Sequence, residues 1–293
     1  MQPHMTNSAS PRGVCRWPSG QRPTRHQLID GVRDMDWTRR DRMRAALGRD
    51  DAPCGRWLRN TGRERMLLTV GANVIISYDG TPNDDDALAL GKMLARAGFG
   101  LALAYVRHSR EFDLRREEVA QHDAEQRLER GAATLGDAEI TRHVVIGAST
   151  GESLGQLAER EGASAVVFGS DYRTPPGHVE PGTSAQYLLE GGSVAVAIAA
   201  AGLRTQLDGA IRSIAVPLAG PTNEVARETA RSLAAKLGAT VRDSSAEPAD
   251  LIVVGSQPGA SAGHVVIGGD VRNELNSARS SVLVLAGGVP LLP

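Results

Sequence analysis

The chain has 293 residues, of which 41% are apolar, 3% are aromatic and 23% are charged, and its formal net charge is -1. This length accommodates one large domain or two ordinary ones, each with a core of its own. The near-neutral charge gives the whole chain no attraction to nucleic acid or to an anionic membrane. Because aromatic residues are scarce, we expect a core of Ala, Val, Leu and Ile.

The first 65 residues differ from the rest in composition. They contain fourteen Arg and no Lys against seven Asp and Glu, together with all three Trp and both Cys. No apolar run follows the basic start, so the segment does not resemble a secretory signal. We expect a disordered leader, or sequence upstream of the true start, because Met66 directly precedes the first patterned strand. The alternative is a basic arm for nucleic acid or a partner, although interleaved Asp residues break up its charge.

Alternating strand and helix patterns begin at residue 73. We expect a strand over 74–78 that ends at Asp79-Gly80, a helix over 84–97 and a strand over 101–106. A charged helix over 111–134, a β-branched strand over 140–146 and a short helix over 153–160 follow. The acidic run 84–86 suits the positive end of a helix dipole, with a Mg²⁺ site beside a phosphate as the alternative.

The stretch 165–199 adds a fourth strand, a loop, a short helix and a fifth strand. The fourth strand ends at Gly169, and the loop leads to Gly182, Thr183 and Ser184 at the start of the helix. Free backbone N–H groups and the helix dipole make such a start a seat for phosphate. The alternative is that Thr183 or Ser184 only caps the helix. The alternation predicts an α/β fold with a doubly wound, parallel, five-stranded sheet, whose ligands lie beyond the carboxyl ends of the strands.

Residues 205–293 read as a shortened second copy of this pattern. With an offset of 86, residues 249–256 fall on 163–170, 263–265 on 177–179, and 282–285 on 196–199. With an offset of 140, residues 214–218 and 226–237 fall on the first strand and the first helix. The second copy therefore lacks about 54 residues, which covers the long charged helix and a neighbouring strand and helix.

The spacing of glycines in the first copy resembles a known signature. From Gly169, two residues lead to Tyr172, nine more lead to Gly182, and Thr183 follows. This resembles the universal stress protein family, whose ATP-binding members carry Gly, two residues, Gly, nine residues, then Gly with Ser or Thr. Three of the four positions match, and Tyr172 replaces the second glycine. Residues 73–200 cover one family domain, so the resemblance implies strand order 3-2-1-4-5 in an adenine nucleotide alpha hydrolase-like fold.

The resemblance also implies a nucleotide site. Asp79, in the string YDGT, stands where the family contacts adenine, and Val106 stands where an apolar residue contacts the base. The glycines and hydroxyls match the positions that hold ribose and triphosphate, and Arg173 could neutralise phosphate charge. The resulting candidate nucleotide-binding residues are Asp79, Gly80, Thr81, Val106, Gly169, Ser170, Arg173, Gly182, Thr183 and Ser184. Against ATP stands Tyr172, since tyrosine neither approaches phosphate as closely as glycine nor readily takes positive φ.

The second copy has lost these candidate residues. Ala219, Pro258 and Gly269 stand where the first copy has Asp79, Tyr172 and Thr183. Family domains commonly dimerise along their fifth strands, so the resemblance implies an intramolecular pseudo-dimer that covers a sheet edge, with a homodimer of chains as a further possibility. The histidines at 178 and 264 share one repeat position, and we expect them to be structural rather than metal ligands.

No dinucleotide fingerprint follows the first strand, and we identify no P-loop, no HExxH, no CxxC and no G-x-S-x-G nucleophile elbow. We expect no catalytic residue and no metal site. We expect a cytoplasmic protein, because no targeting segment or membrane span is evident. The predicted organisation is a leader (1–65), a complete universal stress protein domain (66–204) and a truncated one (205–293). Three functions remain open: a stress-response regulator or sensor that binds ATP with Mg²⁺, a nucleotide-free protein-interaction module, and a slow ATP hydrolase.

Overall fold

The computed structural model describes residues 73–206, 209–217, 223–244 and 248–293. All of these residues belong to one compact unit, residues 69–293. The predicted leader therefore lies outside the described residues, as does Ala219.

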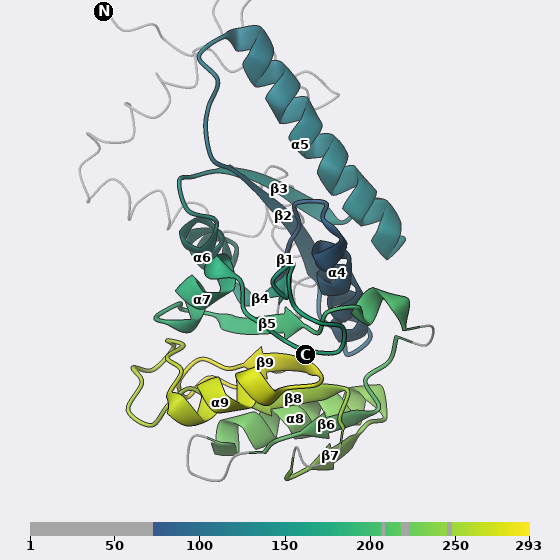
Figure 1. Cartoon of the computed structure of the whole chain (residues 1–293), viewed down its shortest axis with the longest axis vertical. Coiled ribbons are helices and arrows are strands. Elements are labelled where there is room, and N and C mark those ends of the chain that lie inside the picture. Colours follow the sequence, from purple (N-terminus) through teal and green to yellow (C-terminus); the bar gives the residue numbers. More distant parts are fainter. Residues whose placement is uncertain (1–72, 207–208, 218–222, 245–247) are drawn as a thin grey trace, which may run out of the picture. The chain divides into compact units, whose positions relative to one another are not determined.

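The described residues form one sheet of nine strands in the order β3-β2-β1-β4-β5-β9-β8-β6-β7 (Figure 1). The first five strands pair parallel with one another, which confirms the predicted order 3-2-1-4-5. The strands are β1 (Asn73–Ser77), β2 (Leu101–Arg107), β3 (Thr141–Ile146), β4 (Ala163–Gly169), β5 (Ala195–Ala199), β6 (Ser213–Ala215), β7 (Thr240–Arg242), β8 (Leu251–Val254) and β9 (Ser281–Val284).

The second half of the sheet repeats the first with fewer strands. Parallel pairings place β9, β8, β6 and β7 side by side, in the positions of strands 5, 4, 1 and 2 of the first half. The two halves join where β5 pairs antiparallel with β9, with Val196 opposite Val284 and Ile198 opposite Val282. Our sequence analysis did not predict β7, because its three exposed residues give no apolar pattern.

Helices cover both faces of the sheet. They are α4 (Pro82–Ala95), α5 (Leu114–Leu135), α6 (Thr150–Glu161), α7 (Thr183–Leu189), the 3₁₀ helix η1 (Leu203–Thr205), α8 (Asn223–Leu237) and α9 (Gly269–Ser277). One core cluster joins α4, α5 and α8, and the other joins α6, α7 and α9. Adjacent residues of β1 show why, since Ile76 contributes to the first cluster and Ile75 to the second. Each cluster runs through both halves, which therefore share their cores.

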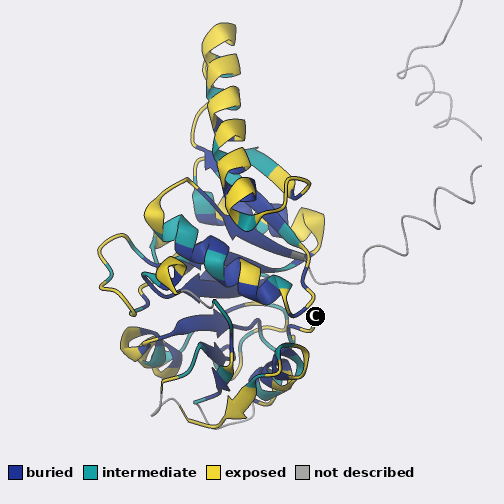
Figure 2. Cartoon of the chain, turned by 90° about the vertical axis from the view of Figure 1, so that its right-hand side faces the viewer, coloured by how far each residue is buried: buried dark blue, intermediate teal, exposed yellow. Residues whose placement is uncertain are grey.

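The helix α5 extends beyond the sheet. Its four buried residues, Ala124, Leu128, Gly131 and Ala132, lie between its middle and its C-terminal end. The first half is largely exposed, as Figure 2 shows at the top of the view. Asp113 caps its N-terminus by accepting hydrogen bonds from two backbone N–H groups, and Gly136 ends it in a left-handed conformation.

Candidate functional site

The predicted site residues come from the carboxyl ends of β1, β2 and β4. Ser77 of β1 pairs with Ala104 of β2, and Ile76 pairs with Val167 of β4. Continuing this register by two residues places Asp79 level with Val106 and with the end of β4. After β4 the loop returns, because Pro181 forms a β-bridge with Ser170. The structure thus brings Asp79, Val106 and the start of α7 to one edge of the sheet.

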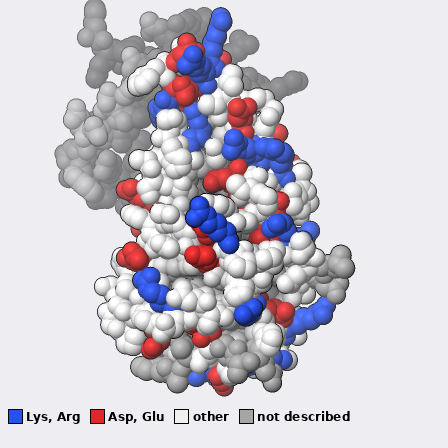
Figure 3. All heavy atoms as spheres, in the orientation of Figure 1, with Lys and Arg blue, Asp and Glu red and all other residues white. Residues whose placement is uncertain are grey.

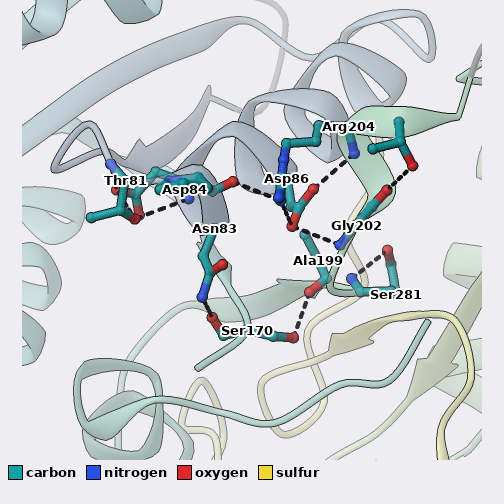
Figure 4. Close-up of polar contacts among 12 residues, drawn as sticks. Thr81, Asn83, Asp84, Asp86, Ser170, Ala199, Gly202, Arg204 and Ser281 are labelled. Atoms are coloured by element: carbon teal, nitrogen blue, oxygen red, sulfur yellow. Dashed lines mark hydrogen bonds and ion pairs between the residues drawn. The ribbon is translucent and has the colours of Figure 1, made fainter. Parts of the chain in front are cut away.

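The turn after β1 is organised by Asp84. Its Oδ2 accepts hydrogen bonds from the backbone N–H groups of Asp79 (3.0 Å) and Thr81 (2.8 Å) and from the Thr81 hydroxyl (2.7 Å). Thr81 in turn caps α4 and completes a capping box, drawn in Figure 4. The N–H groups of 79 and 81 and the Thr81 hydroxyl are therefore occupied within the protein. The Asp79 carboxylate is exposed and makes no hydrogen bond to the described residues.

Charge around this turn favours a neutral or cationic group over a phosphate. Desolvation by the surrounding chain raises the pKa of Asp79, the neighbouring Asp84 raises it further, and His108 and Arg127 oppose this shift. Desolvation also raises the pKa of Asp84, although hydrogen bonds from Thr81 and Asp79 favour its charged form. The guanidinium of Arg127 donates to the Asp79 carbonyl at 3.3 Å. This end of the site suits the amino edge of a base.

Gly169 and Ser170 hold the end of β4 in place. A Cβ at Gly169 would collide with the Asn83 carbonyl, and the Asn83 side chain donates to the Ser170 carbonyl at 2.8 Å. The Ser170 side chain is 4% exposed, and its hydroxyl donates to the Ala199 carbonyl (2.7 Å) and accepts from the Glu180 N–H (3.3 Å). Both residues were predicted as nucleotide contacts. In the structure, Asn83 fills the space beside Gly169, and the Ser170 hydroxyl is already hydrogen-bonded within the protein.

Tyr172, which replaces the second glycine of the family signature, lies in the loop between β4 and α7. Its side chain is 72% exposed, and the Arg173 guanidinium lies over its ring at 4.9 Å. The Arg173 N–H donates to the Asp171 carboxylate at 3.0 Å. No described residue other than glycine has a positive φ, so the loop places Tyr172 in an ordinary backbone conformation.

The start of α7 offers free polar groups. Gly182 is its N-cap, and no side chain completes the cap, so neither Thr183 nor Ser184 caps the helix as the alternative prediction held. Thr183 is exposed and Ser184 is half-buried, and neither hydroxyl bonds to another described residue. A Cβ at Gly182 would meet no atom within 4 Å. Space and donors for an anion are both present here.

Comparison with known proteins places this fold. A scan of protein-family models and a search of curated proteins each find no match. Among solved structures, a universal stress protein from Archaeoglobus fulgidus DSM 4304 matches with TM-score 0.59 and 16% identity over 75% of this chain and 100% of that chain. The chain has the universal stress protein fold.

Two further solved structures match with lower TM-scores. A functionally unknown protein from Pseudomonas aeruginosa PAO1 has TM-score 0.47 and 12% identity over 74% of this chain and 93% of its own. A universal stress protein in complex with cAMP has TM-score 0.25 and 18% identity over 33% of this chain and 70% of its own. The fold assignment rests on the Archaeoglobus fulgidus structure.

Within this universal stress protein fold, the loop after β8 has the same hydrogen bonds as the loop after β4. The Ser256 hydroxyl donates to Leu285 (2.7 Å) and accepts from the Val266 N–H (3.2 Å), as Ser170 does with Ala199 and Glu180 86 residues earlier. The bond from Gly177 N–H to the Ala201 carbonyl recurs from Gly263 to Gly287, each at 2.8 Å. We call these matching hydrogen bonds, made by Ser170 and Gly177 after β4 and by Ser256 and Gly263 after β8, the loop framework.

Sequence analysis missed the role of Asp86. We assigned the acidic run 84–86 to the helix dipole, but Asp86 is fully buried and accepts from the N–H groups of Gly202 and Arg204 (both 2.8 Å) and from the Arg204 guanidinium (2.7 Å). It fixes the segment that leads out of β5. A signal was available, since Asp86 shares the helical stripe of Leu90 and Leu94.

Our sequence analysis identified no G-x-S-x-G nucleophile elbow, but residues 147–151, Gly-Ala-Ser-Thr-Gly, do match that pattern. Ser149 has φ -126° and ψ 125°, which is relaxed extended backbone. Its hydroxyl accepts from the Glu152 N–H at 3.4 Å as the N-cap of α6. Ser149 therefore acts as a helix cap.

Within the part of the chain that the structure describes, no group of three or more His, Cys, Asp or Glu could hold a metal ion. The same residues contain no helix long and apolar enough to cross a membrane. The face drawn in Figure 3 shows Lys and Arg interspersed with Asp and Glu, without a field of one sign.

Proposed function

We propose that this chain is a tandem universal stress protein, a cytoplasmic stress-response regulator or sensor whose first repeat binds an adenine nucleotide. The first repeat is residues 66–204, the shortened second repeat is residues 205–293, and ATP with Mg²⁺ is the candidate ligand. Strand order 5-4-1-2 in the second half and the recurrence of loop hydrogen bonds at an offset of 86 support the tandem organisation. The antiparallel pairing of β5 with β9 supports an internal pseudo-dimer that buries an edge of each half-sheet.

The observation that carries the nucleotide proposal is the difference between the two equivalent helix starts. The first repeat has Thr183 and Ser184 after Gly182, with unpartnered hydroxyls, whereas the second has Gly269 and Asp270 after Gly268. An acidic residue in the first turn of α9 disfavours phosphate there. Only the first repeat therefore combines open space, hydroxyl donors and a positive helix end.

The base and the phosphates of the nucleotide bind at different places along the carboxyl ends of the strands. The adenine lies against Val106, and its amino group donates to the exposed Asp79 carboxylate. The phosphates lie at the start of α7, because Asp84 makes the Asp79 side of the site unfavourable for them. Gly80, with φ 83°, turns the chain away from the base, and Arg173 supplies a cation from the loop.

The second candidate is a nucleotide-free interaction module. The specific observation in its favour is Tyr172, whose exposed ring stacks with Arg173 in place of a glycine that would let the backbone approach phosphate. A slow ATP hydrolase is the third candidate, and no described side chain is placed as nucleophile or general base in its favour.

Titration calorimetry of ATP with Mg²⁺ into the full chain tests the proposal, with cAMP as a second ligand. Gly182→Trp fills the open space before α7, and Gly269→Trp adds the same side chain in the second repeat, where a Cβ also meets no atom within 4 Å. We expect binding in the parent and in Gly269→Trp and none in Gly182→Trp. Absence of heat with every ligand, with the circular dichroism of a folded protein, would favour the interaction module.

A further inference from the structure

A cavity that none of the candidate nucleotide residues lines lies between α4, the end of α5 and η1. Its volume is about 390 Å³, near the lower end of the range for small-molecule sites. One stripe of α4 forms its main wall, since Asp85, Leu88, Ala89, Lys92, Met93 and Arg96 follow helical spacing. We call it the α4–η1 cavity. None of the ten predicted nucleotide residues lines it.

The floor of the α4–η1 cavity is apolar. Leu88, Met93 and Leu203 line it and are each at most 5% exposed. Ala89 and Leu135, both half-buried, extend this apolar surface. A hydrocarbon chain or ring placed there would be removed from water, at about 25 cal/mol per Å² of apolar surface.

The rim of the cavity is cationic. Lys92 is exposed and forms no hydrogen bond or ion pair with another described residue. Arg96 donates to the Gly209 carbonyl at 2.6 Å, which is a neutral partner, and no carboxylate in the described part of the chain pairs with it. The two lie four residues apart on α4, which places their side chains next to each other.

The other charged residues at the cavity determine the net charge that we expect of its ligand. Arg204 is paired with the buried Asp86, so this pair adds no net charge. Asp85 contributes one negative charge, about 10 Å along the helix axis from Lys92. Among the described residues that line the cavity, two cations and one distant carboxylate leave a net single positive charge, which matches a monoanion better than a phosphate ester.

We propose that the α4–η1 cavity binds a small amphipathic carboxylate. The carboxylate lies between Lys92 and Arg96, and the hydrocarbon part lies over Leu88, Met93 and Leu203. This binding is independent of nucleotide at the start of α7.

The sequence provides a direct readout, because Lys92 and Lys236 are the only two lysines in the chain. Lys236 is exposed in the last turn of α8 and, at an offset of 140, takes the position of Arg96 in the second repeat. Modification of the full chain with an amine-reactive reagent, quantified by mass spectrometry, therefore reports Lys92 with Lys236 as an internal control. Octanoate is the test ligand, acetate represents its head alone and octanol its tail alone.

We expect octanoate at ten times its Kd to lower Lys92 modification about tenfold and to leave Lys236 unchanged. Equal concentrations of acetate or octanol should protect Lys92 much less. Equal protection of both lysines, or no protection of Lys92, would overturn the proposal. Protection of Lys92 by ATP would place nucleotide here and overturn the carboxylate assignment.

Two variants place the ligand within the cavity. Ala89→Trp fills the apolar part and should abolish protection by octanoate while Lys92 stays reactive. Arg96→Gln removes one head-group cation without adding bulk, and it should weaken protection even where Ala89→Trp disturbs folding. Unchanged protection in Arg96→Gln would contradict the assigned head-group position.

Discussion

The loops after β4 and β8 have the same framework bonds but different side chains outside that framework. Ser170 and Ser256 make equivalent bonds, as do Gly177 and Gly263. By contrast, Pro258 and Gly269 occupy the positions in the second repeat that correspond to Tyr172 and Thr183 in the first. Both loops therefore use the same framework bonds. Differences in ligand binding between the repeats must come from the positions outside the loop framework.

The first helices of the two repeats differ in the same informative way. Asp86 of α4 and Ala226 of α8 are equivalent at an offset of 140, and both are fully buried. Asp86 binds the segment after β5, whereas the segment after β9 is bonded to α8 through Thr229, whose hydroxyl accepts from the Leu291 N–H at 2.9 Å. A buried carboxylate is retained where three donors converge on it.

Replacing Asp86 should have the largest effect on stability. In Asp86→Ala, the N–H groups of Gly202 and Arg204 lose their acceptor and the Arg204 guanidinium loses its partner, so we expect a loss of about 3 kcal/mol. Urea unfolding of the full chain measures this loss. Asp85→Ala is the matched control and should cost less than about 1 kcal/mol. Equal losses in the two variants would show that Asp86 acts only through the helix dipole.

Removing the framework hydroxyls should have the next largest effect. Ser170→Ala and Ser256→Ala should each cost about 1 to 3 kcal/mol, because each leaves buried backbone groups without a partner. The same unfolding measurement compares the two, and the double variant should show additive losses because Ser170 and Ser256 share no hydrogen-bond partner. A loss confined to one variant would break the equivalence of the loops.

Neutralising Asp79 should give a smaller, pH-dependent effect. Because folding raises the pKa of Asp79, its ionised form is less favourable in the folded than in the unfolded chain. Asp79→Asn should therefore melt at a higher temperature than the parent at pH 7, and the difference should shrink as the pH falls toward the ordinary aspartate value. Melting curves from pH 7 to pH 4.5 test this. A difference that grows on acidification would reverse the assigned sign.

The smallest expected effect comes from His143 in β3, a strand that the second repeat lacks. Burial lowers the pKa of His143, so the unfolded chain binds the proton more strongly than the folded one. The parent should lose a little stability as the pH falls through the ordinary histidine value near 6.5. His143→Gln should remove this loss between pH 7.5 and 5.5 in the same melting assay. An unchanged pH profile would show that His143 is solvated in solution.

Much of the fold followed from patterns local to the chain. The alternation of apolar strands and capped helices predicted the parallel order 3-2-1-4-5, and the internal offsets predicted a shortened second set of strands. Predicted boundaries were close, with the helix expected over 153–160 found at Thr150–Glu161 and the strand expected over 282–285 found at Ser281–Val284. The three-residue β7 was missed because so short a strand carries no periodic signal.

The candidate site was less predictable, because spacing does not show where polar groups find their partners. Gly169 and Ser170 fit the family signature, yet the structure uses one for close packing against Asn83 and the other for framework bonds. Asp84, which was not among the predicted site residues, occupies the N–H groups beside Asp79. Thr183 and Ser184 are the candidates whose hydroxyls stay free.

Local periodicity and spacing in the sequence were enough to predict the strand order, which the structure confirms. They also predict a duplication and the loss of candidate binding residues from the second copy, and both stay predictions. Only the tertiary structure decided that β5 and β9 join the halves into one sheet, that Asp86 is an anchor rather than a dipole partner, and that Lys92 and Arg96 border an apolar cavity. Each of these depends on contacts between segments roughly 85 to 120 residues apart, which no local pattern encodes.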